Sequence, residues 1–189
     1  MIAGSSSDPA RGPSVSVPYL ETRRLLLREL RAGDFPAFAA NSADSVAMQH
    51  FASGIVDRRI AWRQFLAAAG TWLVHGVGWW ALELRETHEV VGQVGAFRRE
   101  LSPDGELELG WVVFRAFWGR GLASEAARGA MAYAFDVQKA DRAIAQIAPS
   151  NEPSIRVAER IGMRFERDVD FGGLLYRQYF VDNNAAARG

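Results

Sequence analysis

The 189-residue sequence predicts a single α/β domain on one mixed, mostly antiparallel twisted sheet, with a strand-helix-strand crossover late in the chain. Two observations predict this class. Residues 78–97 hold two strand-like apolar runs around a polar turn at 85–89, which indicates an antiparallel hairpin. Later, an apolar run at 106–114 is followed by glycines and then by an alanine-rich helical pattern. No internal repeat or linker divides the chain, so we expect one domain.

The first part of the chain predicts a strand, two helices and the hairpin. Residues 23–30 form a short β-compatible run, and the segment after it has Asp34 as a helix N-cap with Pro36 in the first turn. The pattern at 61–73 predicts a second helix.

Strand periodicity assigns the residues of 106–114 to two faces. One face carries Leu107, Leu109, Trp111 and Val113, and the other carries Glu106, Glu108, Gly110, Val112 and Phe114. The second face therefore changes from acidic to apolar along the strand.

The remaining elements alternate between helix and strand. A helix is predicted from Ser124 to about Val137, followed by a strand at 141–148. The next helix has Asn151 as N-cap, Pro153 in its first turn and Gly162 as its stop. Residues 172–181 predict the closing strand.

Composition excludes several classes of function. Lys plus Arg and Asp plus Glu both number 22, so no net charge recruits nucleic acid or an acidic membrane. The chain has no cysteine, hence no thiol nucleophile, and His50, His75 and His88 lack metal-ligand spacing, so we expect no metal.

Neither the N-terminal segment nor the longest uncharged run has the pattern of a targeting signal or a membrane anchor. Residues 1–18 are rich in Gly, Ser and Pro without an apolar core, which predicts a flexible tail before a domain at 19–183. The uncharged run at 65–82 contains three glycines and His75, which favours a helix end, a loop and a strand over a membrane span. We therefore expect a cytoplasmic protein with no membrane partner.

The glycines between strand and helix indicate an anion site. Gly119 and Gly121 allow backbone N–H groups to approach a ligand, and the next helix adds unpaired donors and a positive dipole end. This combination binds phosphate or pyrophosphate, although such glycines can also serve only to turn the chain.

Two nucleotide motifs fail on this segment. A P-loop needs Lys and Ser or Thr after its last glycine, where Leu122 and Ala123 stand. A dinucleotide fingerprint needs a third glycine, where Ser124 stands, and an acidic residue at the end of the next strand, which instead ends in Ile147 and Ala148.

The motif "WGRGLA" at 118–123, together with "NEPSIRVAERIGM" downstream, resembles the GNAT-fold N-acetyltransferases. The similarity is closest to the branch of the ribosomal-protein N-terminal acetyltransferases, and it covers residues 19–182. Trp118 replaces the first polar residue of the family signature Arg/Gln-x-x-Gly-x-Gly/Ala. The resemblance implies a single-domain GNAT fold with helices on both sheet faces and a splayed central strand pair.

The resemblance also implies acetyl-CoA as the acetyl donor. Its pyrophosphate would bind the N–H groups of the glycine loop, and its pantetheine arm would pair with backbone of the preceding strand. Carried over by position, the cofactor-binding residues would be Trp111, Val112, Val113, Trp118, Gly119, Arg120, Gly121, Leu122, Ala123, Ser124, Asn151 and Arg156. For Arg120 and Arg156 the contact would be with CoA phosphates.

The commonest acid and base of the family are both absent. The family's Glu and Tyr positions hold Gln146, which cannot accept a proton, and Ala158. We expect Ser154, one helical turn before Ala158, to deliver the proton, and Glu108 to act as base, either directly or through water. Asn151 would cap its helix and also hold the cofactor, whereas Ser154 as a helix-end residue and Glu108 as a solvated carboxylate are the structural alternatives.

The expected activity is direct transfer of acetyl to a primary amine of a protein N-terminus or small molecule. A non-catalytic acyl-CoA binding or sensing protein is the alternative that Gln146 and Ala158 suggest, and a dinucleotide-binding oxidoreductase is a third. Residues 35–73 and 171–180 would build the acceptor pocket, with Trp79 or Trp80 as a lining residue and the other in the core. Exposed aromatics near the sheet edge make a homodimer possible.

Overall fold

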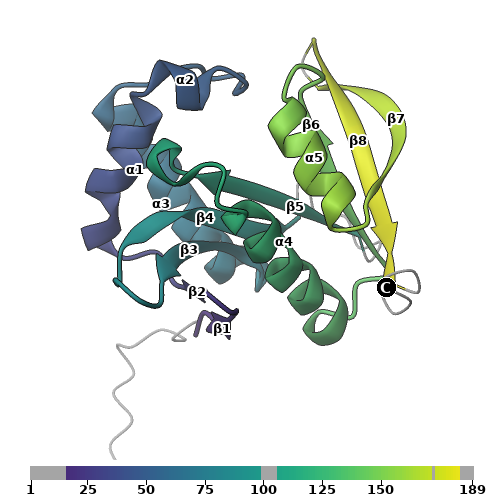
Figure 1. The fold of residues 1–189 in the computed structure, drawn as a ribbon, viewed down its shortest axis with the longest axis horizontal. Coiled ribbons are helices and arrows are strands. Elements are labelled where there is room, and N and C mark those ends of the chain that lie inside the picture. The colour runs from purple at the N-terminus through teal and green to yellow at the C-terminus, as the bar shows by residue number, and fades with distance from the viewer. Residues whose placement is uncertain (1–15, 99–105, 172, 184–189) are drawn as a thin grey trace, which may run out of the picture.

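The computed structural model describes residues 16–98, 106–171 and 173–183, except the Phe171 side chain, and forms one mixed α/β sheet with helices on both faces (Figure 1). The strands are β1 (Leu20–Glu21), β2 (Leu25–Arg28), β3 (Gly78–Leu84), β4 (Val90–Phe97), β5 (Glu106–Val113), β6 (Arg142–Ile147), β7 (Arg164–Phe171) and β8 (Leu174–Asp182). The helices are α1 (Phe35–Ser42), α2 (Ser45–Met48), α3 (Arg58–His75), α4 (Leu122–Ala132) and α5 (Glu152–Arg160). Tyr133–Val137 continue α4 as one π-helical turn.

The strand order is β1-β2-β3-β4-β5-β6-β8-β7, and all neighbours are antiparallel except β5 and β6. The parallel pairing of β5 with β6 covers only Glu106–Glu108 against Arg142–Ile144. Beyond Glu108 the two strands separate, as Figure 1 shows between the teal and the yellow-green halves of the sheet. The predicted mixed sheet and its splayed central pair are confirmed.

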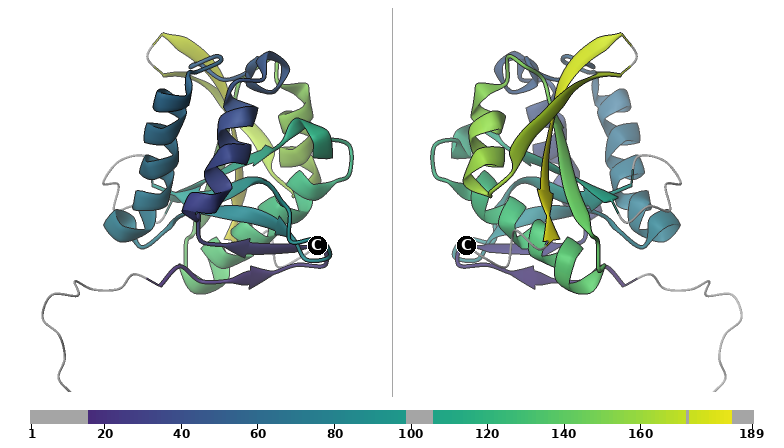
Figure 2. Two further views of the ribbon diagram at one scale, coloured as in Figure 1. Left: turned by 90° about the vertical axis from the view of Figure 1, so that its left-hand side faces the viewer. Right: turned by 90° about the vertical axis from the view of Figure 1, so that its right-hand side faces the viewer.

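Helices cover both faces of the sheet (Figure 2). Ala126, Ala127 and Ala130 of α4 are fully buried in the main core, since small side chains let the helix approach β4 and β5 closely. A second cluster joins Phe35 and Phe38 of α1 to Phe65 of α3 and to Phe114. β5 therefore separates two apolar layers, with Leu109 in one and Phe114 in the other.

Several boundaries differ from the sequence prediction. Strand β7 was missed because "RFERDVDF" at the sheet edge has charged residues rather than apolar alternation. The helix predicted to start at Asp34 is divided into α1 and α2, with the Asp44 carboxylate capping α2. α3 begins at Arg58 instead of 61, and α4 begins at Leu122 instead of Ser124.

Residues 1–15 of the predicted tail lie outside the described residues, and residues 16–18 lie within them. Where the description begins, Val17 packs against the main core, and the Pro18 carbonyl accepts a 2.8 Å hydrogen bond from the buried Trp80 indole. Within the described ranges no helix has the length and apolarity needed to cross a membrane.

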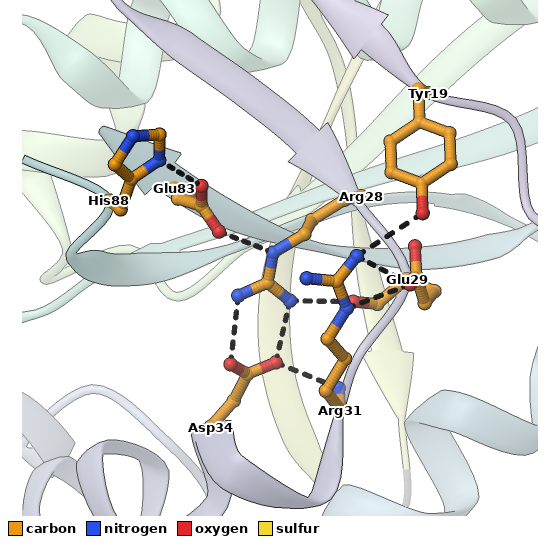
Figure 3. A network of polar contacts seen from close by, with 7 residues as sticks. All are labelled: Tyr19, Arg28, Glu29, Arg31, Asp34, Glu83 and His88. Atoms are coloured by element: carbon orange, nitrogen blue, oxygen red, sulfur yellow. Dashed lines mark hydrogen bonds and ion pairs between the residues drawn. The ribbon is translucent and has the colours of Figure 1, made fainter. Parts of the chain in front are cut away.

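A buried ion network fixes the start of α1 (Figure 3). Arg28, 3% exposed, donates two hydrogen bonds of 2.8 and 2.9 Å to the Asp34 carboxylate and one of 2.6 Å to Glu83. Asp34 precedes α1 as predicted, but its carboxylate makes no cap hydrogen bond, because Arg28 and the Arg31 backbone N–H occupy it. Ion pairing with Asp34 raises the pKa of Arg28, so the guanidinium stays charged despite its burial.

Candidate active site

A cleft of about 710 Å³ opens where β5 and β6 separate. Its wall contains every residue that the sequence proposed for catalysis or cofactor binding except Arg120. Those residues are Glu108, Trp111, Val112, Val113, Trp118, Gly119, Gly121, Leu122, Ala123, Ser124, Asn151, Ser154 and Arg156. Arg120 instead places its guanidinium over the Phe117 ring, 5.2 Å from the centroid.

The glycine turn has a conformation that side chains disfavour. Gly119 and Gly121 have φ of +76° and +74°, and Gly121 precedes the first turn of α4. A Cβ at Gly119 would find no atom within 4 Å, so the backbone there faces open space. The first turn of α4 thus lies at the cleft, at the place where the sequence predicts a site for an anion.

Ser124 adds a hydroxyl beside the glycine turn. The residue is 6% exposed and lines the cleft, yet its Oγ has no hydrogen-bond partner within the described part of the chain. Since buried polar atoms are normally satisfied, this hydroxyl is an exception among the buried polar groups.

An ionic clamp holds the turn from outside the cleft. Glu125 in the first turn of α4 accepts 2.7 Å hydrogen bonds from the Thr22 hydroxyl, the Arg24 N–H and the Arg24 guanidinium. Arg24 also donates to the Arg120 carbonyl at 2.9 Å. Burial works to raise the pKa of Glu125, but these hydrogen bonds outweigh it and lower the pKa below its ordinary value.

Replacing this carboxylate tests the clamp. We expect Glu125→Gln to lower the free energy of unfolding by about 1–3 kcal/mol at pH 7, because charged hydrogen bonds are lost, and to weaken acetyl-CoA binding several-fold. Because the pKa is lowered on folding, the carboxylate stabilises above its unfolded pKa of about 4.3, and this stabilisation is lost as pH falls through the folded value. Denaturant unfolding at pH 7 and below pH 4 measures this. The free energies of unfolding of parent and variant should differ at pH 7 and become similar in acid.

The control is Glu21→Gln, since the Glu21 pair with Arg85 is exposed, and it should change stability by less than about 1 kcal/mol. A constant difference between parent and Glu125→Gln at every pH would contradict the role given to the charge.

β5 directs backbone groups into the splayed region. The Phe114 N–H donates to the Val91 carbonyl, so the antiparallel alternation turns the backbone of Val112 toward β4 and that of Trp111 and Val113 toward the cleft. The Val113 carbonyl accepts a 2.6 Å hydrogen bond from the Trp118 indole N–H. Val112 therefore lines the cleft with its side chain, whereas Trp111 and Val113 offer backbone groups.

Helix α5 forms the opposite wall. The Asn151 carboxamide accepts a hydrogen bond of 3.2 Å from the Ser154 N–H, so the predicted N-cap is confirmed. This bond uses the backbone of Ser154 and leaves its side chain, which lines the cleft, outside the cap. Arg156, paired with Glu152 at 3.2 Å, and Arg160 add positive charge on the same wall.

The other end of the cleft has an aromatic floor. The Trp79 indole stacks on Phe97 with ring centroids 5.0 Å apart and 23° between the planes. A Cβ at Gly95 or Gly110 would lie 2.8 or 2.6 Å from Trp79, so only glycine lets the indole lie flat on the sheet. Trp80 is fully buried, so one tryptophan lines the cleft and the other is core, as predicted.

Glu108 and Gln146 lie on the same face of the sheet as the aromatic floor. Glu108 is 6% exposed, so it is not the solvated carboxylate of the structural alternative. Glu108 is opposite Phe97 on β4 and Ile144 on β6, which places it at the vertex of the splay. Ala158 is fully buried in the core and is not among the cleft residues.

Residues 41–52 and Tyr176 of the cleft wall come from the two segments expected to build the acceptor pocket, but His50, Tyr176 and Arg160 were given no individual role. His50 lines the cleft and contacts the Ser150 hydroxyl at 3.3 Å, although no role was predicted for it. Tyr176 of β8 and Arg160 of α5 are also in the wall. Helical spacing of four from Arg156 could have indicated Arg160, but no local signal marks the other two.

Comparison with known proteins agrees with this geometry. The model of the acetyltransferase (GNAT) domain matches residues 24–164. The chain belongs to the GNAT acetyltransferase family. It is therefore an acetyl-CoA-dependent N-acetyltransferase by family, as the sequence resemblance predicted.

Individual relatives extend over most of the chain. The uncharacterized protein YkkB of Bacillus subtilis strain 168 is 30% identical over 155 residues, which cover 79% of this chain and 87% of that protein. An acetyltransferase structure from Agrobacterium tumefaciens is 31% identical with a TM-score of 0.77, covering 90% of this chain and 98% of that one. RimL, a ribosomal L7/L12 α-N-protein acetyltransferase in complex with coenzyme A, shares the GNAT fold at 14% identity, with a TM-score of 0.74 and coverage of 89% and 99%.

Proposed function

We propose that this GNAT protein transfers acetyl from acetyl-CoA directly to a primary amine of a small molecule or a protein N-terminus. The observation that carries the proposal is the single cleft that joins the glycine turn to Glu108, Ser154 and the aromatic floor. The absence of cysteine from the sequence supports direct transfer, since a thiol nucleophile is lacking.

The cleft fits acetyl-CoA. The N–H groups of the glycine turn and the partnerless Ser124 hydroxyl would hold the pyrophosphate, and Arg156 and Arg160 would add charge for phosphate groups. The cleft-facing backbone of Trp111 and Val113 would pair with the pantetheine arm. Asn151 would contribute mainly by fixing the start of α5.

The chemistry requires a neutral amine and a proton for the departing thiolate. Acetyl-CoA supplies the activated acetyl thioester. Glu108 would accept the amine proton from the floor side of the sheet, and the Ser154 hydroxyl on α5 would donate toward the sulfur. An α-amine has a pKa of about 7.7–8.0 and a lysine amine has a pKa of about 10.4, so an α-amine needs less help from a base near neutral pH.

Titration calorimetry with acetyl-CoA and NADH, followed by CoA-release assays across a panel of amines, tests the proposal. The panel would contain 2-phenylethylamine, spermidine, an aminoglycoside and peptides with free N-termini. Acetyl-CoA binding with amine-dependent CoA release is expected. Binding without release from any amine would favour the acyl-CoA sensor, and binding of NADH alone would overturn the proposal.

The role of Ser154 has its own prediction. We expect Ser154→Ala to lower turnover by about tenfold or more while acetyl-CoA affinity changes little, because general acid help is worth at least that much. Stability should be unchanged, since the cap uses the Ser154 N–H and not its hydroxyl.

Steady-state kinetics, calorimetry and thermal unfolding measure these three quantities. The matched variant is Asn151→Ala, which removes the cap and should cost about 1 kcal/mol of stability. Equal turnover in Ser154→Ala and parent would remove Ser154 from the mechanism.

A further inference from the structure

Gln146 has an unsatisfied hydrogen-bond acceptor at the wall of the cleft. This β6 residue lines the cleft, and its Oε1 is buried with no partner within the described residues. Its Nε2 is engaged, because it donates to the Gln178 Oε1 at 3.2 Å. The two halves of the carboxamide are therefore in different environments.

A chain of hydrogen bonds fixes which half faces the cleft. The Glu166 carboxylate can only accept, and it accepts from Arg142 at 2.5 Å and from the Gln178 Nε2 at 2.8 Å. Gln178 must then turn its Oε1 to Gln146, and Gln146 must turn its Nε2 to Gln178. The direction of the whole chain follows from one carboxylate outside the cleft.

The supporting residues are well held. Gln178 is 3% exposed and lies directly opposite Gln146 in the β6–β8 register. The Arg142 guanidinium also lies over the Phe180 ring, 4.4 Å from the centroid. Hydrogen bonding by Arg142 and Gln178 lowers the pKa of Glu166, so the carboxylate remains an acceptor at neutral pH.

The open acceptor lies on the floor side of the sheet. Gln146 is two residues beyond Ile144, the partner of Glu108, so strand alternation gives Glu108 and Gln146 the same face. Ala145 and Ile147 point to the opposite face, into the main core. Gln146 is thus directed to the end of the cleft with Trp79 and Phe97, away from the glycine turn.

We propose that the Gln146 Oε1 binds an N–H of the acceptor amine and positions its nitrogen, with Arg142, Glu166 and Gln178 as the relay that sets the polarity of the carboxamide. This inference rests on the proposed function, since it assigns the amine end of the same cleft. A primary amine offers N–H groups whether charged or neutral, so the contact persists when the proton leaves. A quaternary ammonium has no N–H group, so it cannot form this hydrogen bond with the Gln146 Oε1.

The relay can be reversed without changing the cleft. In Glu166→Gln the new carboxamide keeps its oxygen on Arg142 and directs its NH₂ to Gln178, so both glutamines turn over and Gln146 presents Nε2 to the cleft. In Glu166→Gln/Gln178→Glu the new carboxylate again accepts from Gln146, which restores the original direction. Gln146→Met removes the acceptor altogether.

Calorimetry on the protein–CoA complex, with 2-phenylethylammonium and its N,N,N-trimethyl analogue as probes, tests the inference. Wild type should prefer the primary ammonium, and Glu166→Gln and Gln146→Met should weaken its binding about tenfold without affecting the trimethyl probe or CoA. The double variant should recover the wild-type preference. A merely structural role for Glu166 predicts no such recovery, and thermal unfolding of every variant checks that each is folded.

Each outcome decides between the two proposals. The inference is overturned if the wild type binds both ammonium probes equally well. It is also overturned if the double variant binds the primary ammonium no more tightly than Glu166→Gln does, or if the variants lose as much affinity for CoA as for the primary ammonium. If wild type releases no CoA with any amine while the preference follows the relay as described, the proposed function fails and the Gln146 assignment stands.

Discussion

Replacing Arg28 with alanine is expected to destabilise the protein by about 3–5 kcal/mol, which is about 6–20 °C in Tm for a chain of this size. The substitution leaves Asp34 and Glu83, 6% and 8% exposed, without the cation that holds them. Asp34 loses its ion-pair partner and Glu83 keeps only the exposed His88 at 3.0 Å, which is costly for carboxylates buried at the junction of β2, β3 and α1. Denaturant and thermal unfolding at pH 7 measure the effect.

Arg31→Ala is the matched control. Arg31 pairs with Glu29 and contacts the Tyr19 hydroxyl, but its side chain is 51% exposed (Figure 3). The expected loss is below about 1 kcal/mol. Similar losses in the two variants would show that burial of the Arg28 network contributes little.

The second large effect is expected at Gly92. A Cβ there would lie 2.1 Å from the Val112 carbonyl oxygen and 3.0 Å from the Val113 Cα. Both are backbone atoms, so Gly92→Ala must push β5 away from β4 where Trp111 and Val113 turn their backbone to the cleft. We expect a loss of about 3 kcal/mol or more, together with weakened acetyl-CoA binding, measured by unfolding and calorimetry.

Gly70→Ala provides a control of opposite sign. Gly70 lies within α3, and a Cβ there would meet no atom within 4 Å. Alanine should stabilise the helix by about 0.5–1 kcal/mol and leave acetyl-CoA affinity unchanged. If Gly92→Ala binds acetyl-CoA as tightly as the parent does, the close β4–β5 contact is not needed for cofactor binding.

The features that could be predicted from sequence depend on residues close together in the chain. Gly119 and Gly121 at the start of α4, and Asn151 as the cap of α5, follow from bonds spanning a few residues. Strand alternation likewise separated Trp79 from Trp80. The family followed from the same local motifs and their spacing.

Long-range contacts account for what could not be predicted. Arg28 meets Glu83 across 55 positions, and Gln146 meets Gln178 across 32. Periodicity along a strand specifies which face of the sheet a side chain lies on. It does not specify which residue of another strand the side chain contacts, because that depends on the order of the strands in the sheet.

The sequence by itself determined the family, the mixed sheet, the glycine turn before α4 and the absence of the usual acid and base. Within the two segments expected to build the acceptor pocket, only the tertiary structure decided that His50 and Tyr176 reach the cleft, and it placed Arg120 outside the cleft wall. It also decided that the Gln146 carboxamide turns its Nε2 to Gln178, because this orientation depends on a carboxylate on β7, an edge strand that the sequence did not predict. Charged edge strands have no apolar alternation to mark them, so their partners are set by the folded sheet.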